Sequence, residues 1–180
     1  PGIRTTSAIA GTTADRNVFN FNIEGCGNND RTRIVMNEKA SLDYEIDCDA
    51  SKFFASVSEG VEIYVDGAVK YDICQRPFAD GTASLGLRTA KTGKYTISLT
   101  GRYADGWIVM LQDKQTGSLV DLTEGSYIFD AESGTSQARF AITFKAPETT
   151  SIDGIIPSGD NANVRVVNTA GITVYEGNIA

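Results

Sequence analysis

The stretch Phe19-Asn20-Phe21-Asn22-Ile23-Glu24 has an apolar residue at every second position and a polar residue between. Successive side chains of a β-strand point to opposite faces, so this pattern predicts a strand with one buried side and one solvent-facing side. The same alternation returns along much of the chain. Those further runs are 42–48, 69–73, 95–99, 107–111, 127–131 and 140–144.

Turn residues separate these runs. Asp66-Gly67 suits a tight hairpin turn, and glycines stand between most of the other runs. Roughly ten to twelve short strands at near-even spacing predict an all-β fold, an antiparallel β-sandwich of jelly-roll type. Only residues 49–55 look helical, with Asp49 as the N-cap, and we expect a short connector of one or two turns there.

The end of the chain has a different character. Residues 146–151 are polar and include a proline, as in a linker, whereas 164–168 and 172–175 form a hairpin pattern around Gly171. We therefore expect a β-sandwich domain at 1–147, a linker at 148–163 and a hairpin at 164–180. About 30 residues cannot bury a core of their own, so the hairpin either docks on the sandwich or begins a truncated second domain.

The composition excludes several classes of function. The chain has no histidine, which removes the Ser-His-Asp triad, the Cys-His dyad and His-ligated zinc. A formal net charge of −7 disfavours contact with a phosphate backbone, so we expect no nucleic-acid partner. The longest apolar run is about five residues, against the roughly 20 that a membrane-spanning helix needs, so we expect no transmembrane segment. No signal peptide is visible, but the chain begins with Pro1, so we expect a mature or excised piece.

Cys26, Cys48 and Cys74 contain no CxxC pair and match no metal-binding pattern. An odd count allows at most one internal disulfide beside one free thiol. We favour three inert thiols over one disulfide. Apart from Arg76 near Cys74, no clear cationic neighbour marks an activated nucleophile.

Two longer stretches carry a resemblance to a known family. Residues 125–134 read Gly-Ser-Tyr-Ile-Phe-Asp-Ala-Glu-Ser-Gly, and residues 139–144 read Arg-Phe-Ala-Ile-Thr-Phe. This pairing resembles the GxYxFxAxxG and RFxIxF pattern of β-sandwich modules that precede the C-terminal sorting domain in Bacteroidetes proteins exported by type IX secretion. Residues 93–97 also resemble that module, and 164–172 resemble the opening strands of the sorting domain. In physical terms the motif residues are core-facing aromatics and turn glycines.

The resemblance implies an extracellular or cell-surface location and an adhesive or structural role within a larger surface polypeptide. It supplies no catalytic residues. The resemblance also implies that the hairpin at 164–180 is the start of a truncated sorting domain. The partners it implies are the remainder of that polypeptide, with a glycan or a host or matrix protein as further candidates.

A candidate ligand site lies at Tyr103, Asp105 and Trp107, which bracket a turn at Gly106. Aromatic rings stack on sugar rings while a carboxylate accepts hydrogen bonds from sugar hydroxyls, so this turn is a candidate carbohydrate site. Trp107 also opens an alternating run, which favours a place in the core.

The acidic residues Asp43, Glu45, Asp47 and Asp49 are the weak candidates for calcium. In a strand they would share one face at about 6.6 Å per two residues, too wide for neighbours to hold one ion without help from elsewhere. A solvated outer face that discourages edge pairing is the favoured interpretation. We expect no cofactor, with calcium as the alternative.

The favoured hypothesis is a non-enzymatic structural or adhesive module of a secreted or cell-surface bacterial protein. The alternative is a carbohydrate-binding module that uses the 103–107 turn. A glycoside hydrolase with two catalytic carboxylates is a third hypothesis, because that mechanism needs no histidine.

Overall fold

The computed structural model describes residues 16–55, 60–77, 81–147, 162–167 and 173–179. The chain divides into two compact units, Pro1–Pro147 and Glu148–Ala180. The second unit contains strands β12 (Ala162–Val167) and β13 (Thr173–Ile179), which pair in antiparallel fashion. The predicted linker at 148–163 lies outside the described residues except for its last two positions.

The first unit is built from β-strands, and its described residues contain no helix. The prediction of an all-β fold is therefore confirmed. The strands are β1 (Arg16–Gly25), β2 (Asn28–Asn37), β3 (Ala50–Ser51), β4 (Val61–Asp66), β5 (Lys70–Arg76), β6 (Thr82–Thr89), β7 (Gly93–Arg102), β8 (Ile108–Asp113), β9 (Leu119–Asp121), β10 (Tyr127–Ala131) and β11 (Gly134–Lys145).

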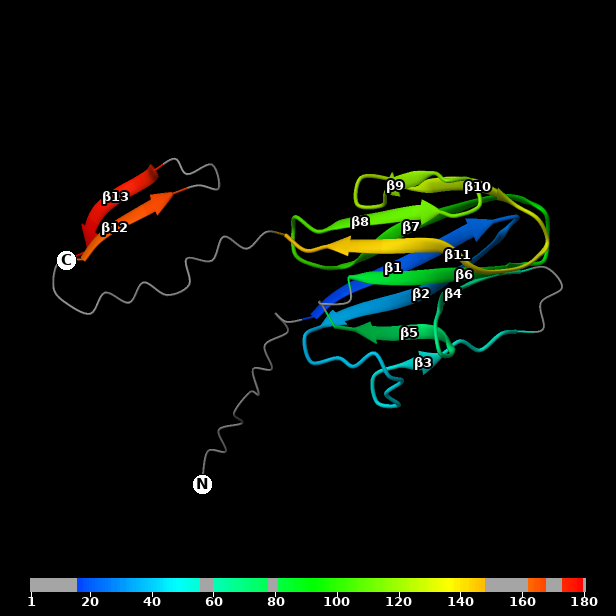
Figure 1. Cartoon of the computed structure of the whole chain (residues 1–180). Helices are drawn as coiled ribbons and strands as arrows, with labels where there is room; N and C mark the ends of the chain where they lie inside the picture. Colours follow the sequence, from blue (N-terminus) through cyan, green and yellow to red (C-terminus); the bar gives the residue numbers. More distant parts are fainter. Residues whose placement is uncertain (1–15, 56–59, 78–80, 148–161, 168–172, 180) are drawn as a thin grey trace, which may run out of the picture. The chain divides into compact units, whose positions relative to one another are not determined.

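These strands form one continuous sheet in the order β10-β7-β1-β2-β5-β4-β6-β11-β8-β9, with β3 paired to β5. The sheet bends over itself into a nearly closed, barrel-like arrangement of two layers (Figure 1). Among the described pairs only β2 and β5 run parallel, so the sheet is mixed where the sequence predicted an antiparallel one. A parallel pair needs a long crossover, which the chain between β2 and β5 provides.

Aromatic side chains from the two layers meet in the core. Phe19 of β1 packs on Phe144 of β11 with ring centroids 5.0 Å apart, and Phe129 of β10 packs on Phe140 of β11 at 5.1 Å. Phe19 is fully buried, as its alternating pattern predicts. Burial of such rings is the main stabilising contribution to a sheet against which no described helix packs.

A two-residue turn joins β1 to β2, because Gly25 pairs with Asn28. The turn residues Cys26 and Gly27 both have left-handed backbones, with φ of 52° and 82°. Positive φ at both central positions is the geometry of a type I′ turn, which glycine adopts freely and cysteine adopts at a cost. The strong pairing of the flanking strands holds Cys26 in this conformation.

Two predicted elements were wrong. Residues 42–48 form no strand, and 49–55 form no helix; the first is a loop, and the second begins with the short strand β3. Asp49 explains both differences. Its Oδ1 accepts a hydrogen bond from the backbone N–H of Gln75 at 2.7 Å, and its Oδ2 accepts one from that of Glu45 at 2.9 Å. The carboxylate therefore closes the preceding loop onto β5 and does not cap a following helix.

A β-bulge interrupts β11. The pairing register with β6 shifts between Ser136 and Phe140, and Ala138 has a positive φ of 45°. The bulge breaks the alternation, so that the consecutive residues Arg139 and Phe140 are both buried. Strict alternation along the strand would place Arg139 on the solvent-facing side, but the bulge turns it into the interior of the first unit.

Candidate functional site

The aromatic turn at 103–107 is integrated into the core. Trp107 is 7% exposed and meets Phe19 edge-on with centroids 5.2 Å apart, while Tyr103 stacks on the same ring at 4.7 Å. Asp105 is exposed. Because the indole faces the interior, it offers little ring surface to a sugar, and the core position that the alternation favoured for Trp107 is confirmed.

The acidic residues 43–49 do not form the ladder of a strand. Asp43, Glu45 and Asp47 are exposed in a loop, whereas Asp49 is buried and already accepts two backbone hydrogen bonds. Within the described residues no three acidic or cysteine side chains gather closely enough to hold a metal ion. The structure thus brings no candidate calcium ligands together in the part of the chain it describes.

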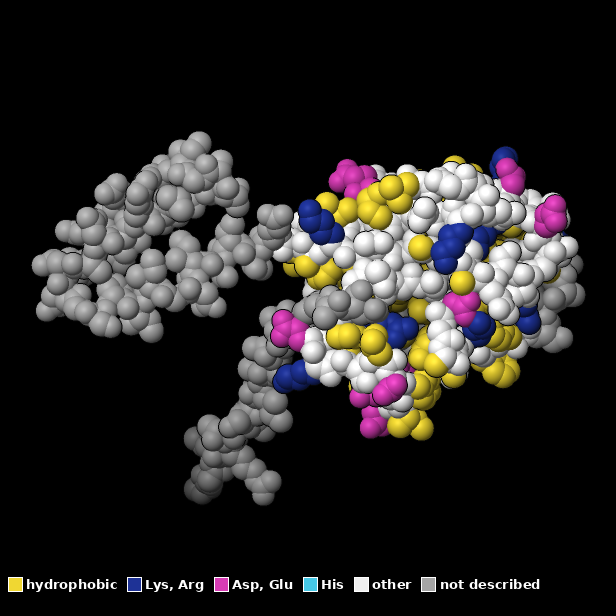
Figure 2. Space-filling model, viewed as in Figure 1, with side chains coloured by type: hydrophobic (Ala, Val, Ile, Leu, Met, Phe, Trp, Pro, Cys, Tyr) yellow, Lys and Arg dark blue, Asp and Glu magenta, His cyan; other side chains and the backbone are white. Residues whose placement is uncertain are grey.

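The same loop exposes apolar side chains. Leu42 is 57% exposed, Tyr44 41% and Ile46 83%, and they alternate with the three exposed acids. Acidic and hydrophobic side chains lie together at the lower edge of the first unit in Figure 2, where Figure 1 draws the loop that precedes β3. We call residues 41–47 the acidic-apolar loop. Three neighbouring exposed hydrophobics are unusual on a solvated surface and indicate a contact region.

The acidic-apolar loop is fixed at its base. Besides the two hydrogen bonds to Asp49, the backbone N–H of Cys48 and that of Asp49 both donate to the carbonyl of Glu45, at 2.9 and 2.7 Å. The ring of Tyr44 lies 5.9 Å from that of buried Tyr71 on β5. These contacts hold one backbone conformation while leaving the outer side chains accessible.

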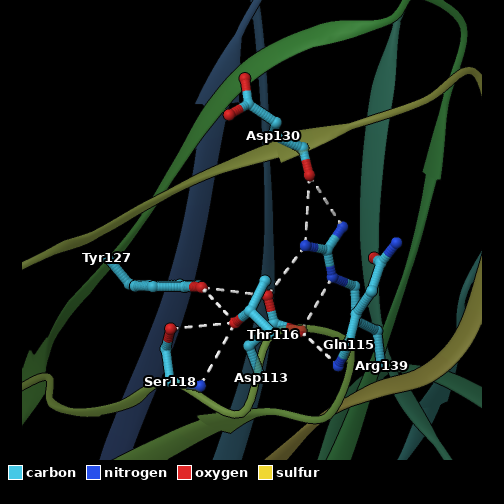
Figure 3. A network of polar contacts seen from close by, with 7 residues as sticks. All are labelled: Asp113, Gln115, Thr116, Ser118, Tyr127, Asp130 and Arg139. Carbon is cyan, nitrogen blue, oxygen red and sulfur yellow. Dashed lines mark hydrogen bonds and ion pairs between the residues drawn. The ribbon is translucent and has the colours of Figure 1, made fainter.

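A buried ion pair lies where the two ends of the sheet meet (Figure 3). Arg139 of β11 donates from Nη2 to Asp113 Oδ2 at 2.8 Å and from Nε to Oδ1 at 3.1 Å. Tyr127 of β10 donates its hydroxyl to the same Oδ2 at 3.0 Å. Since β10 and β11 are not paired in the sheet, Asp113 at the end of β8 connects strands that backbone hydrogen bonds leave apart.

The remaining partners of this network are backbone and hydroxyl groups. Both terminal nitrogens of Arg139 donate to the carbonyl of Asp130 at 3.2 Å, and the N–H of Gln115 donates to Asp113 Oδ1 at 2.9 Å. The Tyr127 hydroxyl also lies 3.1 Å from Thr116 Oγ1. With its donors and acceptors engaged in this way, the network is suited to holding the sheet together, which is a structural role.

The environment of Asp113 determines its ionisation. Burial alone would raise the pKa of its carboxyl, but the hydrogen bonds from Arg139, Gln115 and Tyr127 outweigh burial and hold the pKa below its ordinary value. The guanidinium also lies 4.6 Å from the ring centroid of Phe129 and 5.1 Å from that of Phe140. Asp113 is therefore ionised at neutral pH and paired with a cation held between two aromatic rings.

Sequence reasoning missed this network, although two of its members stand in the motifs that carry the family resemblance. Tyr127 belongs to the 125–134 stretch and Arg139 opens the 139–144 stretch. The sequence around Asp113 does not indicate its role, because a single aspartate near the end of a strand is usually a solvent-exposed residue. Only the fold places it, fully buried, opposite Arg139.

All three cysteines are free thiols: Cys26 is exposed, Cys48 is half-buried and Cys74 is buried. The structure therefore contains no disulfide, and the inertness of the three thiols stays a prediction. Burial of the Tyr95 hydroxyl, followed by its interaction with Cys26, raises the pKa of Tyr95 to about 12. Cys26 thus lies beside a phenol that stays protonated at neutral pH.

Comparisons with protein-family models, with curated proteins and with solved structures find no match. Within the described residues, no helix has the length and apolar character needed to cross a membrane.

Proposed function

We propose that this chain is a non-enzymatic adhesive module of a secreted or cell-surface bacterial protein, and that it contacts a protein partner through the acidic-apolar loop. The observation that carries this proposal is the set of exposed apolar side chains at Leu42, Tyr44 and Ile46. The resemblance of residues 125–144 to exported surface modules supports the location and the role within a larger polypeptide.

The exposed side chains favour binding because covering them removes apolar surface from water. Complete burial of a leucine or isoleucine side chain is worth about 1.5 to 3 kcal/mol. Ile46 and Leu42 have more than half of their surface still to bury. Phe53, 88% exposed just after β3, is a further exposed apolar side chain near β5, since the backbone N–H of Lys52 donates to the carbonyl of Lys70.

The charge of the loop indicates the chemistry of the partner. Asp43, Glu45 and Asp47 are exposed between the apolar side chains, and the whole chain carries a net charge of −7. Opposite charge across an interface raises the association rate and excludes like-charged partners. The loop therefore fits an apolar cleft on a protein whose rim is rich in lysine and arginine.

The anchored base of the loop supports a binding role as well. A loop that is ordered before contact loses less conformational entropy on binding than a flexible one. The carboxylate of Asp49 supplies that order through its bonds to Gln75 and Glu45. The loop thus combines an exposed apolar surface with a fixed backbone.

The test is binding of the full chain to immobilised fibrinogen, fibronectin and collagen, compared with a Leu42→Ser, Tyr44→Ser and Ile46→Ser triple variant. We expect wild type to bind at least one of these proteins and the triple variant to bind about tenfold more weakly or not at all. A Leu119→Ser and Ile128→Ser double variant is the matched control, since those side chains are 64% and 62% exposed on β9 and β10.

Two outcomes would overturn the proposal. One is that wild type binds none of the three proteins. The other is that the loop variant, with unchanged thermal stability, binds as well as wild type and as well as the control. Turnover of a substrate by the isolated chain would overturn its non-enzymatic part.

Carbohydrate binding is a second candidate function. A polar groove on the outer face of β7, β1, β2 and β5 favours it, at a different place from the 103–107 turn.

A further inference from the structure

An open groove of about 640 Å³ lies on the outward face of the sheet. Four adjacent strands line it. Its outward-pointing side chains, which alternate with core residues, are Asn22, Glu24, Asn29, Arg31 and Arg33, whereas Asp30 pairs with buried Ile23 and shares its face. The polar residues of the lining are Ser98 of β7, Asn22 and Glu24 of β1, Asn29, Asp30, Arg31 and Arg33 of β2, and Asp72 of β5. The volume is in the range of small-molecule and oligosaccharide pockets.

Two arginines in this groove have unused hydrogen-bonding capacity. Arg31 is exposed, and among the described residues its guanidinium makes no hydrogen bond or ion pair. Arg33 donates from Nε to Asn20 Oδ1 at 2.9 Å and forms no ion pair with a described residue. The two stand two residues apart on one strand, so both guanidinium groups face the same side.

The acceptors in the groove balance these donors. Glu24 is exposed on β1, and Asp72 retains 43% exposure of its side chain although Lys52 Nζ lies 2.8 Å from it. Positive and negative groups therefore share one groove, which favours no ion of either sign. A sugar hydroxyl both donates and accepts, and planar groups such as guanidinium, carboxylate and amide match two neighbouring hydroxyls at once.

The lining is held in place before any ligand arrives. Asn22 Nδ2 donates to Thr100 Oγ1 at 3.0 Å. Lys52, with 6% of its side chain exposed, lies 2.7 Å from Asp30 and 2.8 Å from Asp72. Side chains on strands and fixed by such contacts form a more precise site than side chains on loops.

We propose that this groove binds a neutral polysaccharide chain, recognised through hydrogen bonds from Arg31, Arg33 and the amides beside them. None of the described residues that line the groove is aromatic, so hydrogen bonding and shape carry the recognition. This site is separate from the acidic-apolar loop and does not depend on the loop's role.

The test is affinity electrophoresis of the full chain in native gels that contain galactomannan, arabinoxylan, mixed-linkage β-glucan or dextran, with alginate as an anionic comparison. We expect at least one neutral polymer to retard wild type. Arg31→Gln should weaken the retardation about tenfold, as expected for loss of a charge-assisted hydrogen bond. Arg102→Gln is the matched control, because Arg102 is also exposed and its loss changes the net charge equally.

Asn29→Ala is a second groove variant at an exposed position and should also weaken retardation. The proposal is overturned if no neutral polymer retards wild type, or if only alginate does. It is equally overturned if both groove variants, folded as judged by an unchanged Tm, migrate like wild type. Because the loop variant with serine at 42, 44 and 46 keeps the groove, it should be retarded like wild type.

Discussion

Replacing Asp113 with Asn tests whether the buried ion pair holds the two ends of the sheet together. The change keeps the size of the side chain but removes the charge that faces Arg139, whose side chain is only 4% exposed. Breaking a buried pair by removing one partner costs about 3 to 5 kcal/mol, because the other charge stays buried without compensation. The Asp130 carbonyl and two flanking rings still contact the guanidinium, so we expect the lower part of that range.

A loss of this size is measurable in two ways. At about 2 to 4 °C per kcal/mol for a domain of this length, Tm should fall by roughly 6 to 12 °C for a loss of about 3 kcal/mol. Urea unfolding followed by the fluorescence of Trp107, the single tryptophan, gives the free energy of unfolding directly.

A double variant separates the ion pair from general packing. Asp113→Asn combined with Arg139→Met removes both charges, so the cost should be at least about 1 kcal/mol less than the sum of the single costs. The ion pair does not hold the two ends of the sheet together if Asp113→Asn lowers the free energy of unfolding by less than about 1 kcal/mol. The same follows if the costs of the two single changes simply add in the double variant.

Further predictions concern the first unit. The hydrogen bonds to Asp113 hold its pKa below the ordinary value of 3.8. The ionised carboxylate therefore contributes its full stabilisation above pH 3.8, and this stabilisation is lost as the pH falls through the lower, folded-state pKa. Over that pH window the free energy of unfolding of Asp113→Asn should fall less steeply than that of wild type. Gly101→Ala should cost about 1 to 3 kcal/mol in urea unfolding, because Gly101 has φ of +151° and an added Cβ would lie 2.0 Å from the carbonyl oxygen of Val18. Gly125→Ala, which meets no atom within 4 Å, should change stability by less than about 0.5 kcal/mol. Trp107→Ala should cost about 3 to 5 kcal/mol by calorimetry because the ring is buried, whereas unchanged stability would mean that the indole is an exposed binding platform.

The strands of the core could be predicted because their alternation is tied to burial. In β1 the apolar residues Phe19, Phe21 and Ile23 are all buried, and the polar residues between them line the outer face. The same reasoning failed at 42–48, where the apolar and the acidic residues are both exposed and no described strand pairs with them. Alternation is thus a signal of a strand only where one face has a core to cover.

Local sequence patterns could not predict the features that depend on contacts between residues far apart in the chain. The parallel pairing of β2 with β5 leaves no trace in either strand's sequence. The bulge at Ala138 turns Arg139 inward against the period-two expectation, and its partner Asp113 lies 26 positions away. The polar groove was missed for a different reason: Asn, Ser and Arg on the outer face of a sheet look like an ordinary solvated surface until the fold shows that they share one depression.

The measurement that most directly tests the proposed function is the dissociation constant for fibrinogen, fibronectin and collagen at low and at high NaCl, by biolayer interferometry, for wild type and the Leu42→Ser, Tyr44→Ser and Ile46→Ser variant. Wild type should bind at least one of these proteins, high NaCl should weaken this binding because the loop is acidic, and the variant should not bind. If wild type and the variant bind each immobilised protein with equal affinity, or if wild type binds none of them, the loop is not the contact region.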